Sequence, residues 1–380
     1  MNDPAAVDQP ASILPAPGTI SLARGIPATE TFPVEQLAQC SARAIEYHGR
    51  VVLNYGDPQG FPPLCEWLAE RHGVTPEQIL ITPGSIMGLS FLARVLLEGN
   101  GRAAIEAPCY DRMIGLLGRL GAEVIPVART SHGLDLDELR RAFAQRSRPG
   151  FFYVLPTFHN PMGLTMTLGE REALVDLALE LEIVVIEDDP YGLLRVEGDS
   201  LPLLHELLRQ RDAGHLAVHL SSFSKTVSPG MRVGYVVAPV SLQGRLRALA
   251  TATYVSPPLL AQAELYEYLR AGHLEPHLAY LQSFLRVRRD ALLEVFGQRM
   301  PPDAQWTRPQ GGYFLWLDLP PRIDAATLAR RSAAVGVTII PGNGFFPGSG
   351  GEYGARLSFS FPSVEEIRAG AERLAELVSG

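Results

Sequence analysis

The 380-residue sequence contains a single lysine, Lys225, since every other residue among its 33 lysines and arginines is an arginine. Arginine stays protonated in proteins, whereas a lysine in a desolvated site can lose its proton and attack a carbonyl carbon. Formation of a Schiff base is the plainest task that needs a lysine and that arginine cannot perform. A codon bias toward arginine that left one lysine by chance would give the same count, so the neighbouring motifs must decide between the two interpretations.

The residues around Lys225 suit a phosphate group held beside an imine. Ser222 lies three residues before the lysine, and Arg232 lies seven residues after it. A hydroxyl and a fixed positive charge are suitable groups for binding a phosphate. The segment therefore favours a Schiff base over a lysine left by chance.

Three further motifs follow apolar segments that are typical of buried strands. Asp188 and Asp189 follow one such segment, where a carboxylate can pair with a ring nitrogen or simply cap a helix. Gly84 stands at a predicted strand-to-helix turn, where backbone N–H groups and the helix N-terminus can face an anion. Asn160 lies in the segment His159-Asn160-Pro161-Met162-Gly163, for which an ordinary turn is the alternative.

Taken together, these motifs resemble those of the class I/II aminotransferases, which are pyridoxal 5′-phosphate (PLP) enzymes of fold type I. The resemblance is carried by Ser222-Phe223-Ser224-Lys225 with Arg232, by residues 159–163 and 187–192, and by Ala355-Arg356-Leu357-Ser358-Phe359-Ser360. Gly-Asp-Pro-Gln-Gly at 56–60 and Glu-Asp-Asp-Pro-Tyr-Gly at 187–192 are similar to the subgroup of 2-aminoadipate and broad-specificity aminotransferases, which includes the catalytic-like domains of MocR-type regulators. The resemblance runs from about residue 20 to the C-terminus.

The resemblance implies PLP as the cofactor and a role for each motif. Lys225 would hold the cofactor as an internal aldimine and then carry the substrate proton. Asp188 would keep the pyridine nitrogen protonated, with Asp189 as its rival by position, and Tyr191 would hydrogen-bond the phenolic oxygen. The other implied cofactor contacts are Gly84, Ser85, Ile86 (through its backbone), Tyr110 (stacked on the ring), Asn160, Ser222 and Arg232, with Tyr55 supplied by the neighbouring subunit of a homodimer.

Substrate contacts are implied at Gly25, Asn160 and Arg356. The guanidinium of Arg356 can bind an α-carboxylate through two hydrogen bonds, and an ordinary surface arginine is the alternative. Arg24 replaces the first of two glycines that the subgroup often has at this point, and it would either bind an acidic side chain or point to solvent. His159 would either line the site or be an ordinary core histidine.

The expected activity is transfer of an amino group from an L-amino acid to a 2-oxo acid, by a ping-pong mechanism through the Lys225 aldimine. The alternative is a PLP-dependent cyclase, decarboxylase, eliminase or oxidase of an amino acid in a natural-product pathway, because the same motifs serve all of these reactions. A MocR-type regulator is disfavoured, because only about 20 residues precede the resemblance and no helix-turn-helix fits them.

Apolar runs that alternate with helical patterns must position these residues. Strands are predicted at 78–82, 102–106, 123–127, 151–155, 183–187, 217–221 and 233–238, and helices at 85–97, 134–144 and 168–181. Continuous apolar strands between helices indicate an α/β fold with a mostly parallel, seven-stranded sheet covered on both faces. Ligands bind beyond the carboxyl ends of such strands, and Ser85, Tyr110, Asn160, Asp188 and Lys225 all follow predicted strands.

After about residue 260 the pattern changes to that of a smaller α+β domain. A long helical region is expected at 257–296, strands at 313–319, 337–340 and 356–361, and helices at 325–335 and 364–378. We expect an N-terminal arm at 1–19, a large PLP-binding domain at 45–265, and a small domain formed by 20–44 with 266–380.

The composition argues against several other classes of protein. A net charge of −8 without a basic run gives no support to nucleic-acid binding. No targeting signal is found, and no apolar run reaches the roughly 20 residues of a transmembrane helix. Cys40, Cys65 and Cys109 lack metal-binding spacing, and their odd number without a signal peptide indicates reduced thiols in the cytoplasm. The expected partners are a second copy of the chain and small amino and oxo acids.

Overall fold

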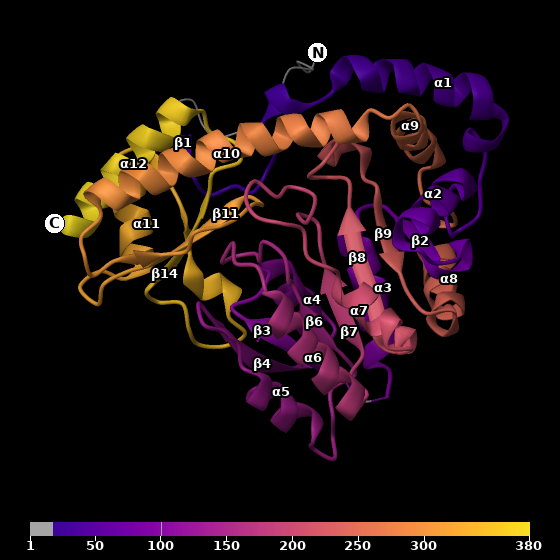
Figure 1. Ribbon diagram of the computed structural model, residues 1–380, viewed down its shortest axis with the longest axis horizontal. Coiled ribbons are helices and arrows are strands. Elements are labelled where there is room, and N and C mark those ends of the chain that lie inside the picture. The colour runs from indigo at the N-terminus through magenta and orange to yellow at the C-terminus, as the bar shows by residue number, and fades with distance from the viewer. Residues whose placement is uncertain (1–17, 100) are drawn as a thin grey trace, which may run out of the picture.

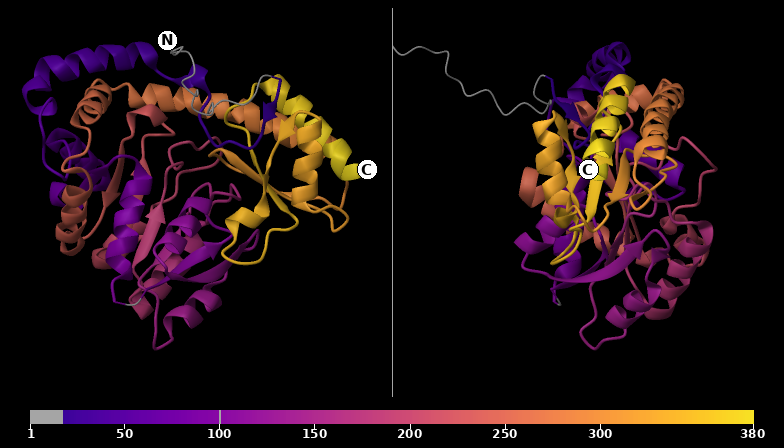
Figure 2. Two further views of the ribbon diagram at one scale, coloured as in Figure 1. Left: turned by 180° about the vertical axis from the view of Figure 1, so that it is seen from behind. Right: turned by 90° about the vertical axis from the view of Figure 1, so that its left-hand side faces the viewer.

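The computed structural model describes residues 18–99 and 101–380, so the expected arm at 1–19 lies outside the described residues except for its last two. Figure 1 shows a central sheet with helices packed on it, and a second group of helices and short strands beside the sheet. Figure 2 shows these two parts from behind and from the side. Within the described part of the chain, no helix has both the length and the apolar character needed to span a bilayer.

The central sheet has eight strands in the order β2-β9-β8-β7-β6-β3-β4-β5. Their bounds are β2 (Ile79–Thr82), β3 (Arg102–Ala107), β4 (Glu123–Thr130), β5 (Gly133–Leu134), β6 (Phe152–Val154), β7 (Val185–Asp188), β8 (Ala217–Ser222) and β9 (Gly234–Val237). Strands β4, β3, β6, β7 and β8 are mutually parallel, whereas β9 is antiparallel to both of its neighbours and β5 is antiparallel to β4. The mostly parallel sheet is confirmed. The expected count of seven strands is too low by one, because a turn before Gly133 folds the two-residue β5 back onto the end of β4.

Helices cover both faces of the sheet, as expected. One layer contains α3 (Ser85–Leu97), α4 (Asp111–Arg119) and α8 (Val240–Tyr254), and the other contains α5 (Leu136–Phe143), α6 (Leu168–Leu181) and α7 (Leu204–Gln210). Successive side chains on a strand face the two layers in turn. Thus Tyr153 of β6 and Ile186 of β7 pack with the α3 layer, whereas Phe152 and Val185 pack with the α6 layer. The same alternation places Asp188 on the α3 side of the sheet.

The second part of the chain contains α9 to α12 and short strands. Its elements are α9 (Leu259–Arg270), α10 (Leu274–Arg299), β10 (Gln305–Trp306), β11 (Phe314–Asp318), α11 (Ala325–Ala334), β12 (Val337–Thr338), β13 (Ile340–Pro341), β14 (Gly354–Ser358) and α12 (Val364–Ser379). The strands pair antiparallel in the order β10-β11-β14-β13. The long helical region expected at 257–296 is two helices, because the chain turns at Gly272, which has a φ of +74° that favours glycine.

The N-terminal segment connects both parts of the molecule. Its elements are β1 (Ile20–Ser21), α1 (Val34–Val52) and α2 (Pro62–His72). Strand β1 pairs with β12 and α1 packs along α9, whereas α2 packs against β2 of the central sheet. Short 3-10 helices occupy Thr29–Thr31, Pro76–Gln78, Gly214–Leu216, Pro229–Met231 and Gly342–Phe345. The expected domain boundary at residue 44 falls inside α1, which continues across it. The division into domains therefore stays a prediction.

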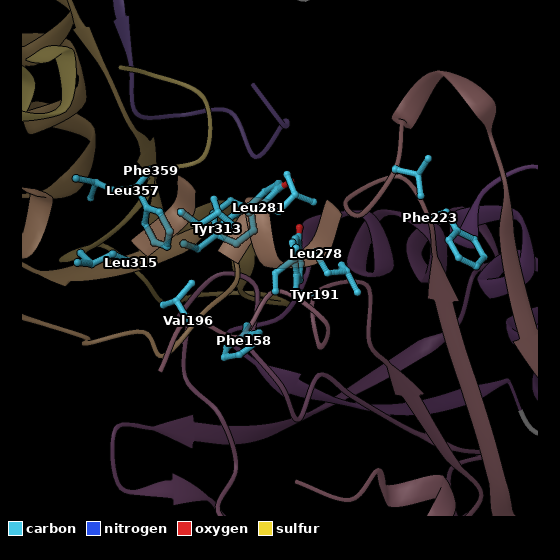
Figure 3. Close-up of a cluster of buried hydrophobic side chains, with 14 of the residues drawn as sticks. Phe158, Tyr191, Val196, Phe223, Leu278, Leu281, Tyr313, Leu315, Leu357 and Phe359 are labelled. Atoms are coloured by element: carbon cyan, nitrogen blue, oxygen red, sulfur yellow. The ribbon is translucent and has the colours of Figure 1, made fainter. Parts of the chain in front are cut away.

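An apolar cluster joins the two parts of the molecule (Figure 3). Phe158, Tyr191 and Phe223 come from loops that follow strands of the central sheet, and Leu278 and Leu281 come from α10. Val196 comes from the chain between β7 and α7. The labelled cluster is completed from β11, β14 and the residues beside them by Tyr313, Leu315, Leu357 and Phe359. Burial of this apolar surface stabilises one arrangement of the sheet against the C-terminal part.

Candidate active site

A cavity of about 330 Å³ lies beyond the carboxyl ends of β3, β6, β7 and β8 and reaches the C-terminal part. It is lined by Gly25, Ser85, Ile86, Tyr110, Asp111, Arg112, Leu155, Asn160, Asp188, Pro190, Tyr191, Ser222, Ser224, Lys225, Pro229, Arg232, Phe314 and Arg356. The cavity thus brings together every predicted site residue except Gly84, Tyr55 and Arg24. The parallel topology explains the result, because it places the ends of neighbouring strands at one edge of the sheet.

Lys225 lies in the turn that follows β8, with its amino group inside the cavity. Its Nζ donates a hydrogen bond to the backbone carbonyl of Gly25 at 2.7 Å, and it lies 6.0 Å and 5.5 Å from the ring centroids of Tyr191 and Tyr313. Burial, together with the positive charges of Arg356 and Arg232, lowers the pKa of Lys225 to about 8. The neutral, nucleophilic amine is therefore more populated near neutral pH than it is in an ordinary lysine.

Asp188 and Asp189 face opposite sides of the sheet. Asp188 is buried at the end of β7, where its Oδ2 accepts a hydrogen bond from the hydroxyl of Tyr153 at 2.5 Å. Its Oδ1 is also buried and has no protein partner among the described residues. Burial raises the pKa of Asp188 to about 7. Asp189 instead lines a separate cavity of about 580 Å³, together with His219 and Tyr235.

One end of the cavity is suited to a phosphate group. The Ser222 hydroxyl donates to the Ser224 Oγ at 2.9 Å, and Nη1 of Arg232 lies 3.5 Å from the same Oγ. A side chain at Gly84 would collide with the guanidinium of Arg232, and one at Gly234 would collide with the backbone of Ser85. The two glycines therefore allow the arginine and the N-terminus of α3, with its free backbone N–H groups, to meet at one point. Gly84 shapes this end of the cavity without lining it.

The opposite end of the cavity contains Arg356 on β14. Its Nη1 donates to the Oδ1 of Asn160 at 2.9 Å, and its Nη2 donates to the carbonyl of Ala23 at 3.0 Å. The guanidinium lies 4.3 Å from the ring centroid of Phe314 and 4.9 Å from that of Phe345. The two rings and the hydrogen bonds fix a planar donor group in the cavity, as binding of a carboxylate requires.

Arg24 does not line the cavity. The backbone on either side of it faces inward, because the carbonyls of Ala23 and Gly25 accept hydrogen bonds from Arg356 and Lys225. The side chain of Arg24 is exposed. Arg112, with a side chain that is 71% exposed, is the arginine at the rim of the cavity.

His159 is a core residue and does not line the cavity. It is fully buried, and its Nε2 lies 3.3 Å from the Oε2 of Glu106. The Oε1 of the same carboxylate pairs with Nη1 of Arg129 at 3.0 Å. This buried group lies behind the turn that contains Asn160. The second interpretation of His159, as a core histidine, is therefore the one that fits the structure.

The sequence motifs did not reveal several residues of the site. Phe314 and Arg112 line the cavity, and the hydroxyl of Tyr313 donates to the carbonyl of Lys225 at 3.2 Å. Tyr153 contacts Asp188 from inside the core. The only feature of the sequence that could have indicated this role of Tyr153 is its place within an apolar strand, since a buried hydroxyl usually requires a hydrogen-bond partner.

The family model described as "Aminotransferase class I and II" matches residues 17–374 of the chain. The chain belongs to this family. The expected family, fold type I architecture and aminotransferase activity are thereby confirmed, and this aminotransferase uses PLP as its cofactor.

Similar proteins cover nearly the whole aminotransferase. It is 37% identical to 2-aminoadipate transaminase of Thermus thermophilus, over 96% of this chain and 91% of that protein. It is 31% identical to aromatic-amino-acid aminotransferase 1 of Thermococcus litoralis, over 94% and 88% of the two chains. A crystal structure of an alpha-aminoadipate aminotransferase from Thermus thermophilus, complexed with N-(5′-phosphopyridoxyl)-L-leucine, superposes with a TM-score of 0.90 at 35% identity over 96% and 93% of the chains.

The cavity of this aminotransferase fits PLP in three respects. Among the described residues, the buried Oδ1 of Asp188 lacks a partner, which a protonated ring nitrogen would supply. Gly84 leaves room for Arg232 beside the N-terminus of α3, as a phosphate requires. The amino group of Lys225 lies in the same cavity, with a lowered pKa. When bound, PLP supplies an aldehyde carbon for amino groups and a ring that withdraws electrons.

Proposed function

We propose that the aminotransferase moves the amino group of an L-amino acid to a 2-oxo acid in this cavity, with Lys225 as its central residue. The observation that carries the proposal is that the amino group of Lys225, the unpartnered oxygen of Asp188 and the guanidinium of Arg356 meet in one cavity. Lys225 would hold the cofactor and move a proton between substrate atoms, and its lowered pKa of about 8 suits proton transfer.

The remaining residues bind and orient the reacting groups. Asp188 would place a negative charge near the ring nitrogen of the bound cofactor, and Tyr191 would donate a hydrogen bond to its phenolic oxygen. Arg356 binds the substrate α-carboxylate from one side, with Asn160 and Gly25 beside it. The proposed phosphate contacts are Ser85, Ser222, Arg232 and the backbone of Gly84 and Ile86, and Tyr110 is proposed to stack on the ring. For Arg24, we favour the alternative that it points to solvent.

A half-reaction separates this proposal from other PLP chemistry. The PLP-loaded enzyme is mixed with one amino donor and no 2-oxo acid, and we expect about one equivalent of the matching 2-oxo acid per site. The amino group stays on the enzyme until an acceptor arrives, so neither CO2 nor ammonia should be released. Release of CO2 would instead indicate a decarboxylase, and release of ammonia would indicate an eliminase or an oxidase.

We propose that the active unit is a homodimer with shared sites. Large apolar side chains are exposed on α1, on the loop after it and at the end of α8: Val34, Ile45, Tyr47, Val51, Leu53, Tyr55 and Val255. Tyr55 is 81% exposed and lies outside the cavity of its own chain, as a residue that completes the partner's site would. Figure 1 shows α1 at the outer edge of the molecule, where a second copy can reach it.

Hybrid dimers test whether sites are shared. We expect Tyr55→Ala to bind PLP more weakly and Lys225→Ala to be inactive. Mixing the two should raise activity at limiting PLP, because one of the two sites in a hybrid dimer then combines an intact Lys225 with an intact Tyr55. The control is a chain that carries both substitutions. Mixing it with Tyr55→Ala should give no increase in activity. If the mixture shows only the activity of Tyr55→Ala, each site belongs to a single chain.

We also propose a cytoplasmic location and the domain division given above. The location is supported by Cys40, Cys65 and Cys109, which are all free and buried. The domain division is supported by the separate sheet of β10, β11, β14 and β13, although α1 and α9 cross the proposed boundaries. The substrates are small amino and oxo acids, and no nucleic acid or membrane is proposed as a partner.

A further inference from the structure

We propose that Tyr153 is a positioning residue of the reaction, which acts by fixing the carboxylate of Asp188 with one oxygen turned toward the cofactor ring. This inference rests on the proposed role of Asp188. Tyr153 is fully buried in β6, and among the described residues it is not part of the cavity lining. We therefore expect it to act on the reaction through Asp188 and not by contact with substrate or cofactor.

The two carboxylate oxygens of Asp188 have different hydrogen-bonding surroundings. Oδ2 accepts the hydrogen bond from the Tyr153 hydroxyl at 2.5 Å, whereas Oδ1 is buried and has no partner in the part of the chain that the structure describes. Rotation about the last side-chain bond would exchange the two oxygens, and for a carboxylate this torsion has only a weak intrinsic preference. The hydrogen bond from a neighbouring strand supplies that preference. Because Tyr153 and Asp188 project from adjacent parallel strands toward the same helical layer, the strand pairing of β6 with β7 sets their distance.

The same hydrogen bond favours the charged form of Asp188. Burial raises the pKa of this carboxyl to about 7, and the charge of Asp189 adds to the rise. The hydrogen bond from Tyr153 and the charge of His219 act in the opposite direction. Burial also raises the pKa of Tyr153 well above its usual range, so its hydroxyl remains a donor. Cys109 and Tyr110, the other titratable groups near Tyr153, also have raised pKa values because they are buried. Tyr153 is therefore the neutral donor that keeps a carboxylate opposite the ring.

The test compares Tyr153→Phe, Asp188→Asn and the double variant, each as the PLP-loaded enzyme. We expect Tyr153→Phe to lower kcat by about 10- to 100-fold, the range for loss of one hydrogen bond to a charged group, with KM changed by less than about threefold. The double variant should be no worse than Asp188→Asn alone, because Tyr153 acts only through that carboxylate. The matched control is Tyr268→Phe, which removes another buried hydroxyl that donates to the carbonyl of His273, outside the cavity.

A second measurement does not depend on activity. The carboxylic acid band of Asp188 can be followed by infrared difference spectroscopy of the apoenzyme, with Asp188→Asn to assign it. We expect its titration midpoint to rise by about one pH unit or more in Tyr153→Phe. If this variant does not fold, 3,5-difluorotyrosine at position 153 keeps the shape of the ring and strengthens the donor, so the midpoint should fall.

The outcomes are distinguishable. If Asp188→Asn loses activity but Tyr153→Phe changes neither kcat nor the carboxyl midpoint, the role of Tyr153 is overturned and the proposed function stands. If the losses multiply in the double variant, Tyr153 acts independently of Asp188, and the inference is wrong. If Asp188→Asn itself retains full activity, the proposed role of Asp188 fails, and the role of Tyr153 fails with it.

Discussion

Replacement of Lys225 by alanine is expected to lower turnover by at least about 10³-fold, since both the covalent attachment of the cofactor and the proton transfer are lost. The loss should be this large because the chain contains no second lysine that could substitute. PLP should still bind weakly through its phosphate, at Ser222, Arg232 and the N-terminus of α3. The variant should therefore contain cofactor that dialysis removes.

The position of attachment can be measured directly. Borohydride reduction of the PLP-loaded enzyme followed by peptide mapping should label the peptide that contains Lys225 and no other. The capture of PLP by the apoenzyme should become faster as the pH rises through about 8, because only the neutral amine of Lys225 attacks an aldehyde. A reduced cofactor on any other residue would show that Lys225 is not the attachment site.

Asp188→Asn is expected to lower kcat by about 10²- to 10³-fold, the range found when one group that stabilises developing charge is removed. An amide cannot hold a negative charge opposite the ring nitrogen. Asp189→Asn is the matched control, because it makes the same chemical change at the next residue on the opposite face of the sheet. Its loss of kcat should be much smaller.

Steady-state kinetics of Asp188→Asn and Asp189→Asn with a single donor and acceptor would show which variant loses more of its kcat. The reverse order, with Asp189→Asn the more damaged enzyme, would mean that Asp189 is the partner of the ring. The structure makes this order difficult to accommodate, because Asp189 would have to cross from the cavity at His219 and Tyr235 to the one at Lys225.

Local sequence patterns predicted the fold well where apolar periodicity is strong. The helices α3 and α6 have the expected bounds, and α6 begins with a capping box between Thr167 and Glu170 that fixes its first residue. The pattern was weaker where the chain reverses within a few residues. A two-residue strand such as β5 has no periodicity of its own, and the turn at Gly272 interrupts two helices of similar composition.

The candidate site was predictable to the extent that its residues follow strands. Asp188, Asn160 and Lys225 could be placed together because parallel topology brings strand ends to one edge. Exposure could not be predicted in the same way. Arg24 and Arg112 are both arginines beside predicted site residues, yet only Arg112 lines the cavity. Which side chain points inward depends on backbone direction in loops, and no period of two or of 3.6 residues describes it.

The helix α10 has a mechanical consequence for substrate binding. It contains 26 residues and is therefore about 39 Å long, and Figure 1 shows it running from α9 across to the C-terminal part, which contains Arg356. A rod of this length that tilts by about 5° at one end moves its other end by about 3 Å, which is comparable to the length of a hydrogen bond. A tilt of α10 at the turn around Gly272 would thus shift the C-terminal part, including Arg356, by a distance that matters for a hydrogen bond to a carboxylate. We therefore expect substitutions at this turn, which lies outside the cavity, to change the KM for substrate.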